Sequence, residues 1–367
     1  MTEHVLFPFI GQDIGGSHVS AFTLAQSLAQ DFGHRCTVIA REGSRIATEA
    51  AAMGLGVIGT GEKTAGRHNP VYDAARVFAR TALLRPPAII HTNDIAALQS
   101  WLVPAWLAGI PTIYHHRALN RRVLPNTMLI RAASHVIAIS DETRRSVNYL
   151  PEQRVSTITD PFAIDRSTDR SAARAWLIGK LGLLSEAVII GFVGNFWRRK
   201  RPEFFIEAAA AMVAREPRAA FVFFGRDGEL TVRNLQTIAA RLGIGERVHF
   251  PGFCLPVERN LAALDLLLMP AVREPFGRTP IEAALLGTPY VATDDAGHTE
   301  IGRRWKGGRL VDKDDSAGSF AEAALTVLAE PQSVLLSTQA RLDVAEDVSP
   351  RRHAERVIAV YEQLRHV

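Results

Sequence analysis

The sequence predicts an α/β fold with two doubly wound domains, each a parallel sheet covered by helices on both faces. Three observations lead to this prediction. Short β-rich runs alternate with helical patterns, which is typical of parallel sheets. The alternation starts again near residue 187. A chain of 367 residues is also longer than a domain built around a single hydrophobic core usually is.

The first half of the chain begins with an apolar run followed by a helical pattern. "VLFPFI" predicts a buried strand over 5–10, and "SHVSAFTLAQSLAQDFG" predicts a helix over 17–33 that ends at Gly33. Further β-rich runs, separated by helical segments, predict strands at 36–40, 88–92, 111–116 and 135–140.

The second half repeats this order, with strands predicted at 187–195, 219–225, 247–253, 265–271 and 289–294. We place the domain boundary between Asp160 and Ser185, where "TDPFAIDRSTDRSAARAW" becomes polar and turn-forming. The expected domains are therefore 1–165 and 166–349. Residues 350–367 follow a Ser-Pro start signal and form an amphipathic pattern, so we expect a C-terminal helix that packs back toward the N-terminal domain.

The composition is that of a globular protein, with 47% hydrophobic and 22% charged residues. The net charge of 42 − 38 = +4 fits an anionic small ligand or membrane surface, and nucleic-acid binders usually cluster charge more strongly. Cys36 and Cys254 lack metal-ligand spacing, so a reducing cytoplasm is the expected location. The N-terminus lacks a basic signal region, and no run of about eighteen apolar residues predicts a membrane span.

A glycine turn follows the first strand, in "GQDIGGSHVS" over 11–20. Gly15 and Gly16 permit close backbone approach, and the start of the next helix favours an anion. The spacing is not that of the dinucleotide fingerprint, and no acidic residue is evident at the end of the second strand, which disfavours a nicotinamide oxidoreductase. A ligand loop and an ordinary tight turn both fit this stretch.

A second glycine turn, "GNFWRRKRPEFFIEA" over 194–208, opens the other half. Four consecutive cations, Arg198 to Arg201, precede a helix that Pro202 starts well. Such a run is either a solvated surface or a clamp for a diphosphate. Its place after the first strand of a half favours phosphate binding, because ligands of open α/β sheets gather at the carboxyl ends of strands. With two such sheets facing each other, we expect the ligand cleft between the domains.

The stretch "REPFGRTPIEAALLGTP" over 273–289 sets two carboxylates around the start of a helix. The helix should begin near Gly277 and stop at Gly287, so that its first N–H groups favour an anion. Glu274 lies before the helix, and Glu282 lies inside it among small and apolar residues, where an unpaired carboxylate is costly. Because a carboxylate accepts two hydroxyl hydrogen bonds, the pair suits a polyhydroxylated ligand beside a phosphate.

This stretch resembles the signature of retaining GT-B glycosyltransferases, in which seven residues separate two glutamates, and family four in particular. "EPFGRTPIEAALLGTPYVATDDAG", "FFGRDGE", "VHFPGF", "GGSHV" and "HVIAISDETR" are similar to further segments of that family. The resemblance implies that Glu282 binds the ribose of a nucleoside diphosphate sugar and that Glu274 contacts the transferred sugar. Lys200 would neutralise the diphosphate, which Gly15 and Gly16 would approach from the other domain. Backbone N–H groups would hold sugar and diphosphate oxygens at Phe276, Gly277, Arg278 and Thr279.

The sequence departs from the family pattern at several positions. Asn195 replaces a family arginine, for which Arg198 or Arg199 would have to substitute. Arg226 stands where an acidic residue is common. The family histidine near the sugar corresponds to His115 or His116, and the register does not decide between them. Asp160 replaces the asparagine of a common turn, so no role is assigned to it.

The implied reaction is metal-independent transfer of a sugar from a UDP-, GDP- or ADP-sugar to a saccharide or lipid-linked acceptor, with retention of configuration and no cofactor. Cell-surface polysaccharide, lipopolysaccharide or glycoconjugate synthesis is the expected setting. The alternatives are a nucleotide-sugar epimerase of the same architecture and a non-catalytic nucleotide-sugar-binding protein. The segment 117–133 combines cations with apolar residues, so we weigh peripheral contact with the inner membrane face against an ordinary surface segment.

Overall fold

The computed structural model describes residues 3–12, 14–60, 88–119 and 123–364. The chain forms two compact units, described separately below. Unit 1 comprises Met1–Ala163 together with Glu346–Val367, and unit 2 comprises Ile164–Ala345. The sequence placed these divisions after residues 165 and 349.

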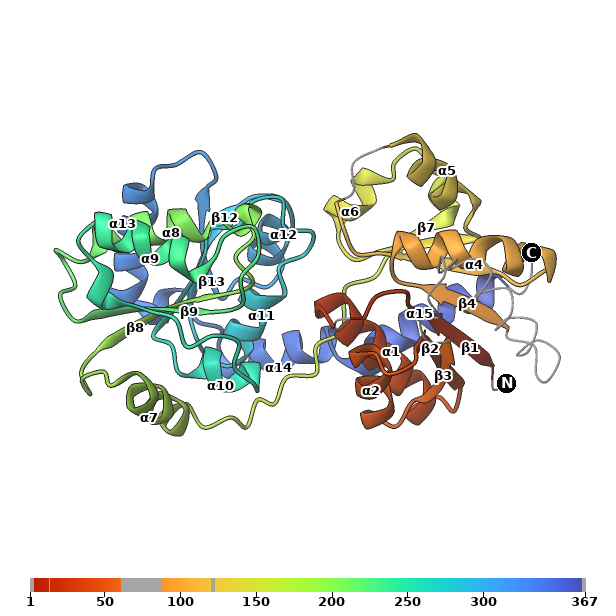
Figure 1. Ribbon diagram of the computed structural model, residues 1–367, viewed down its shortest axis with the longest axis horizontal. Coiled ribbons are helices and arrows are strands. Elements are labelled where there is room, and N and C mark those ends of the chain that lie inside the picture. Colours follow the sequence, from red (N-terminus) through yellow and green to blue (C-terminus); the bar gives the residue numbers. More distant parts are fainter. Residues whose placement is uncertain (1–2, 13, 61–87, 120–122, 365–367) are drawn as a thin grey trace. The chain divides into compact units, whose positions relative to one another are not determined.

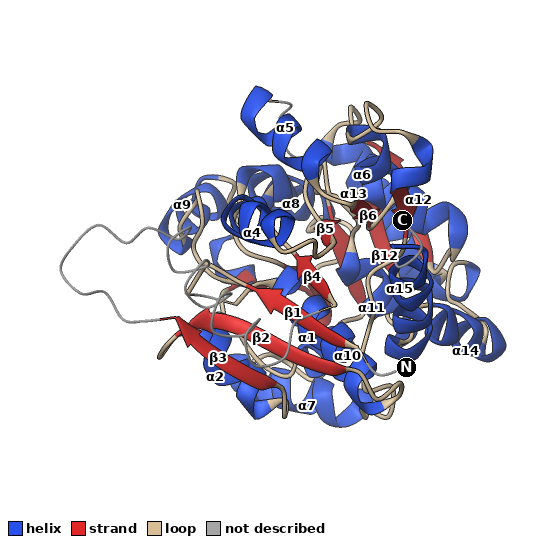
Figure 2. Ribbon diagram, turned by 90° about the vertical axis from the view of Figure 1, so that its right-hand side faces the viewer, coloured by secondary structure: helices blue, strands red, loops and turns tan. Residues whose placement is uncertain are grey.

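The sheet of unit 1 is parallel throughout and has the strand order β3-β2-β1-β4-β5-β6-β7. Figure 2 shows strands β3, β2, β1 and β4 side by side. The strand order reverses between β1 and β4, which makes this pair the switch point of the sheet. The strands are β1 (His4–Pro8), β2 (Arg35–Arg41), β3 (Gly56–Thr60), β4 (Ile89–Thr92), β5 (Thr112–His116), β6 (His135–Ala138) and β7 (Val155–Thr157).

Helices cover both faces of this sheet. One face packs against α1 (Gly16–Gln30), α2 (Arg45–Ala52) and α15 (Pro350–Leu364), which buries Phe22, Ile46 and Val357 in one core. The other face packs against α4 (Ile95–Leu107), α5 (Leu124–Ala132) and α6 (Asp141–Ser146). The short 3-10 turn η1 (Glu152–Arg154) leads into β7.

The sheet of unit 2 is also parallel, with the order β10-β9-β8-β11-β12-β13 and its switch point between β8 and β11. The predicted doubly wound α/β architecture is therefore confirmed in each unit. The strands are β8 (Val188–Val193), β9 (Ala219–Phe224), β10 (Val248–His249), β11 (Leu266–Met269), β12 (Tyr290–Asp294) and β13 (Gly308–Asp312).

The two faces of this second sheet also have separate helical layers. Helices α8 (Pro202–Met212), α9 (Val232–Arg241) and α13 (Ala317–Ala329) cover one face and lie together in Figure 1. Helices α7 (Arg170–Leu181), α10 (Val257–Ala262) and α11 (Arg278–Leu285) cover the other. The remaining elements are α12 (Ala296–Arg304), α14 (Thr338–Asp347), η2 (Arg198–Lys200), η3 (Gly245–Arg247) and η4 (Pro331–Ser333).

The stretch that the sequence presents as a polar boundary contains helix α7. Asp169 caps its start by accepting hydrogen bonds from the N–H groups of Ser171 and Ala172. Gly182 ends it in the left-handed conformation, at φ 64°. Ala173 and Leu177, four residues apart, are buried in the core below. The polar residues of this stretch therefore occupy the exposed face of a helix, which composition alone does not reveal.

Candidate functional site

The loop after β8 stands on an aromatic core. Phe196 is 1% exposed, and its ring lies 5.9 Å from that of Phe223 in an edge-on arrangement. Burying one phenylalanine is worth roughly 1.5–3 kcal/mol, so the loop is anchored where it leaves the strand. The turn η2 then carries Arg199 and Lys200 toward the neighbouring loop, where the N–H of Val272 donates to the Arg199 carbonyl oxygen at 2.8 Å. The two loops at the switch point are thus joined.

Three of the predicted site residues meet at this junction. Lys200 Nζ lies 2.8 Å from Oε2 of Glu274, and the Arg199 guanidinium donates to the same oxygen. The side chains of Lys200 and Glu274 are only 14% and 12% exposed. Burial acts to raise the pKa of Glu274, but the charges of Lys200 and Arg199 outweigh it and lower that pKa to about 2. Glu274 is therefore a carboxylate at neutral pH.

Glu282 forms the second carboxylate position, on helix α11. Gly277 precedes the helix with φ 92°, and no side chain of the described residues caps the helix start. Glu282 is buried, and its Oε1 accepts a hydrogen bond from Arg278 at 3.1 Å, which supplies the partner that burial requires. Among the described residues, Oε1 of Glu274 and Oε2 of Glu282 accept no hydrogen bond. Each carboxylate can therefore accept a further hydrogen bond.

The remaining predicted positions of unit 2 follow strands β8, β9 and β11 in the chain. Phe276 is buried, with its ring edge-on to Trp305, and Thr279 is half-buried in the first turn of α11. Asn195 is exposed. Arg226 stacks its guanidinium over the Phe253 ring at 4.2 Å. In the described residues, no side-chain hydrogen bond or ion pair joins Asn195 or Arg226 to Glu274.

The N-terminus of α12 supports the turn that carries Glu274. The Asp295 carboxylate accepts a hydrogen bond from the Arg273 N–H at 2.6 Å, and the Gly297 N–H donates to the Glu274 carbonyl oxygen at 2.9 Å. His298 follows on the same helix and is 1% exposed. Burial lowers its pKa to about 4, although Glu274 acts in the opposite direction, so the ring is neutral near pH 7.

In unit 1 the predicted glycines stand at the start of α1. Gly15 is the residue before the helix, and its N–H donates to Nδ1 of His18 at 3.1 Å. Both Gly15 and Gly16 are exposed. The ring of His18 packs 5.3 Å from that of Phe9, at the carboxyl end of β1. The glycine turn therefore follows β1, one of the two strands at the switch point of its own sheet.

The two candidate histidines lie inside β5 and on opposite faces of the sheet. His116 is 1% exposed and faces α6, where its Nε2 lies 2.7 Å from Oγ of Ser146. His115 is fully buried on the other face and stacks its ring 5.7 Å from that of His353 in α15. Neither ring is accessible to a ligand in this structure. The expectation that one of them contacts the transferred sugar gains no support here, and the first residue after the strand is Arg117.

A buried polar network surrounds Arg117. Its guanidinium donates to Asp160, to Asn93 Oδ1 at 3.2 Å and to His115 Nδ1 at 3.2 Å. A guanidinium can only donate, so Nδ1 of His115 is an acceptor and the ring carries its proton on Nε2, 4.0 Å from Asp160. Ser20 of α1 also donates to Asp160. No sequence motif predicts that Arg117 and Asp160 form a pair, because the two residues are 43 positions apart in the chain.

Comparison with known proteins gives a consistent result. Residues 14–166 match glycosyltransferase family 4, and residues 187–330 match the glycosyl transferases group 1 family. A protein of Catenulispora acidiphila named D-inositol 3-phosphate glycosyltransferase 1 is 31% identical over 313 residues, which are 76% of this chain and 73% of that protein. The chain belongs to the family 4 glycosyltransferases.

A second relative and a solved structure agree with this membership. A D-inositol 3-phosphate glycosyltransferase of Geodermatophilus obscurus is 32% identical over 254 residues, or 65% of this glycosyltransferase. That match spans 55% of the relative's own length. The Anabaena protein HepE, solved in complex with UDP-glucose, superposes with a TM-score of 0.84 at 21% identity, over 98% of this chain and 100% of HepE. This likeness shows the GT-B fold.

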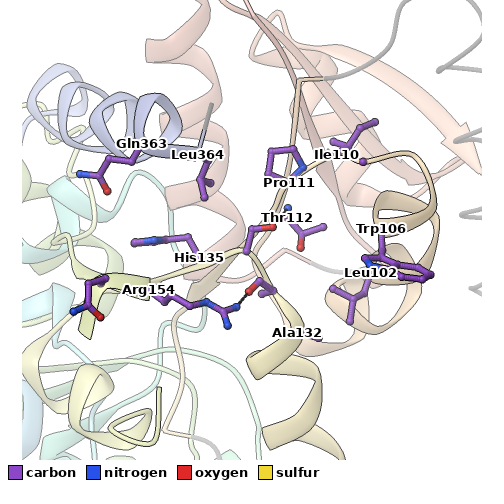
Figure 3. Close-up of a pocket in the computed structure, with 14 residues that line it drawn as sticks. Leu102, Trp106, Ile110, Pro111, Thr112, Ala132, His135, Arg154, Gln363 and Leu364 are labelled. Carbon is purple, nitrogen blue, oxygen red and sulfur yellow. Dashed lines mark hydrogen bonds between the residues drawn. The ribbon is translucent and has the colours of Figure 1, made fainter. Parts of the chain in front are cut away.

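A pocket of about 570 Å³ in unit 1 is separate from the predicted positions of the glycosyltransferase. It lies at the amino ends of β5 and β6, with Leu102 and Trp106 of α4 on one side and His135 and Arg154 on another (Figure 3). Arg154 donates to the carbonyl oxygen of Ala133. Ligands of parallel sheets bind at the opposite, carboxyl ends, so this pocket is not the candidate donor site.

Neither a metal-binding cluster nor a membrane-spanning helix occurs among the described residues. In residues 3–12, 14–60, 88–119 and 123–364 of this glycosyltransferase, no group of three or more His, Cys, Asp or Glu side chains is arranged to hold a metal ion. Over the same part of the chain, no helix has the length and hydropathy needed to span a membrane.

Proposed function

We propose that this glycosyltransferase moves a sugar from a nucleoside diphosphate sugar to an acceptor hydroxyl, with retained configuration and without a metal ion. The observation that carries the proposal is the junction of Glu274, Lys200 and Arg199 beside the start of α11. It combines two cations and a helix start, which suit a diphosphate, with a carboxylate oxygen open to a sugar hydroxyl.

The proposed mechanism follows the charge that develops during transfer. Negative charge grows on the departing diphosphate, and Lys200, Arg199 and the first N–H groups of α11 would stabilise it. Of the two cations considered as replacements at Asn195, Arg199 has the better position. It reaches Glu274, whereas the Arg198 guanidinium lies 3.8 Å from Glu203. Glu274 would hold a hydroxyl of the transferred sugar, and Glu282 the ribose.

Donor binding is tested by thermal stabilisation with UDP, GDP and ADP and with UDP-glucose, GDP-mannose and ADP-glucose. A ligand at about 100 times its Kd stabilises the folded protein by about 2.7 kcal/mol. Glu282→Ala should remove most of that stabilisation. Glu322→Ala, which changes an exposed carboxylate of the same unit, should keep it. Unchanged nucleotide affinity in Glu282→Ala would refute the ribose assignment.

The leaving-group role is tested with Lys200→Met. Removal of one preorganised donor to a developing anion typically costs roughly 10²–10³-fold in kcat. Lys180→Met is the matched control. It makes the same substitution on helix α7, where Lys180 Nζ lies 6.0 Å from the centre of the Trp176 ring. A Lys200→Met variant with wild-type kcat would remove Lys200 from the mechanism. The configuration of the product is read from its anomeric proton signals, and inversion would overturn the retaining assignment.

The acceptor is proposed to be a polyhydroxylated molecule. The Catenulispora and Geodermatophilus relatives are named for D-inositol 3-phosphate, so that compound joins saccharide and lipid-linked acceptors in the panel. Conversion of the donor without any acceptor would favour the epimerase alternative. Tight donor binding with no turnover would favour the binding protein.

Peripheral contact with the cytoplasmic face of a membrane is a further part of the proposal. Helices α4 and α5 are neighbours and expose large apolar side chains, with Trp106 77% and Leu124 74% exposed. Asn120, Arg121 and Arg122 of the predicted segment lie outside the described residues. Anionic vesicles should sediment the protein at low but not high salt, and the variant Trp106→Ser/Leu124→Ser should remain in solution. Indifference of the wild type to vesicles would refute this contact.

A further inference from the structure

His298 is a buried side chain to which the proposed transfer assigns no role. Its ring is almost completely inaccessible, and neither ring nitrogen has a hydrogen-bond partner within the described part of the chain. Buried polar side chains in native proteins nearly always have a partner, and each exception calls for an explanation. An apolar residue of similar size would fill this place without leaving polar atoms unpaired.

The surroundings of His298 are the Glu274 turn itself. A Cβ atom built on Gly277 would lie only 2.6 Å from Cδ2 of His298, so the ring packs directly against the backbone of this turn. A Cβ atom on the preceding Gly297 would lie 2.4 Å from the carbonyl oxygen of Phe276. The start of α12 and the turn are therefore in close contact, so the His298 ring is part of the packing that supports the Glu274 turn.

His298 is also within electrostatic reach of the charges of the site. Glu274, Lys200 and Arg199 all influence the ring, as does Asp295 of its own helix segment. In the structure the two cations occupy Oε2 of Glu274. A bound diphosphate would attract the same two cations, because phosphate oxygens are strong acceptors of charged hydrogen bonds. Glu274 would then need another donor close by.

We propose that His298 is the positioning residue of Glu274. Its ring supports the Gly277 turn, and its N–H becomes the hydrogen-bond donor to Glu274 when a diphosphate draws Lys200 and Arg199 away. The two ring nitrogens, which have no partner within the described residues, would then gain one in the donor-bound state. This inference rests on the proposed function, because it requires a diphosphate at the two cations.

The experiment compares three single variants in donor binding and transfer. His298→Phe keeps a ring but removes both nitrogens, and His298→Asn keeps an N–H donor. Tyr290→Phe is the control, because it removes another buried donor of unit 2, to the carbonyl oxygen of Lys306. The donor is whichever of UDP-glucose, GDP-mannose and ADP-glucose stabilises the wild type.

We expect His298→Phe to lower kcat/KM for the donor about tenfold or more, while His298→Asn and Tyr290→Phe stay within about threefold of wild type. Affinity for the corresponding nucleoside diphosphate, which lacks the sugar, should stay within about threefold in all three. In a Glu274→Gln background, His298→Phe should lower kcat/KM by a further factor of less than about three, because the effects of two residues that act together are not additive.

Three results would overturn the inference. The first is wild-type kcat/KM in a folded His298→Phe variant. The second is a double variant in which the losses of kcat/KM caused by His298→Phe and Glu274→Gln multiply. The third is a His298→Phe variant that loses affinity for the nucleoside diphosphate by the same factor as it loses kcat/KM for the donor. If His298→Phe does not fold, the contrast between His298→Asn and His298→Ala decides the same question. Absence of nucleoside diphosphate binding by the wild type refutes the proposed function as well, whereas active wild type with unaffected His298→Phe refutes this inference alone.

Discussion

Replacement of Asp160 by asparagine should destabilise unit 1 strongly. The side chains of Arg117 and Asp160 are only 4% and 5% exposed, and Arg117 donates directly to the carboxylate. Asparagine preserves the shape but removes the charge, which leaves a buried guanidinium without a counter-charge. Breaking a buried pair in this way costs about 3–5 kcal/mol.

The expected change in melting temperature follows from the size of the unit. Unit 1 contains 163 + 22 = 185 residues. For a unit of this size, 1 kcal/mol shifts Tm by about 2–4 °C, so Asp160→Asn should lower Tm by roughly 6–20 °C. Circular dichroism during heating measures this shift.

Two further variants test the reasoning about charge. Glu142→Gln breaks the pair with Arg145, whose side chains are 33% and 67% exposed, and should cost no more than about 1 kcal/mol. Arg117→Met added to Asp160→Asn should recover most of the lost stability, because no uncompensated charge remains. A Tm of Asp160→Asn within about 2 °C of wild type would refute the argument.

Three other outcomes are expected. Burial lowers the pKa of His353 to about 3, so as the pH falls the unfolded chain takes up a proton at this residue before the folded protein does. The contribution of His353 to the free energy of unfolding should be fully present above about pH 6.5 and fall toward pH 4, by up to about 1.4 kcal/mol per pH unit. Urea titrations at pH 7, 6 and 5 should show a flatter pH dependence for His353→Phe. Gly277→Ala should cost roughly 1–3 kcal/mol in urea unfolding, because it combines φ 92° with a contact against His298, and an unchanged midpoint would contradict the left-handed geometry of this turn. Sugar transfer should persist in EDTA; complete loss, restored by a divalent ion, would refute the metal-independent mechanism.

The sequence predicted the centres of both sheets better than their edges. Central strands such as β8 and β11 are covered on both faces, so they appear as continuous apolar runs. The strands that the sequence missed, β3, β7 and β13, are all edge strands, and β10, which it made too long, is another. Edge strands are short or carry polar residues, as in "GRLVD" of β13, so their apolar signal is weak.

The candidate site could be anticipated only in part. Glu274 and Lys200 follow the two strands at the switch point, and the sequence placed both on loops after strands without predicting their direct contact. His298 also follows a strand and opens a helix, so the same criterion would have found it. Arg117 and Asp160 could not be paired from the sequence, because their contact depends on how β5 and the chain after β7 come together in the folded unit.

Helix α15 has a consequence for the order in which the chain is made. It supplies Val357, Val360 and Tyr361 to the core of unit 1, and the Tyr361 hydroxyl lies 2.7 Å from Nδ1 of His91. During synthesis these residues leave the ribosome only after all of unit 2. Unit 2 can therefore fold while unit 1 still exposes the apolar surface of α1 and β1 that α15 covers. The fold of unit 1 is therefore completed only after unit 2 has been made, and until then its exposed apolar surface is prone to aggregation.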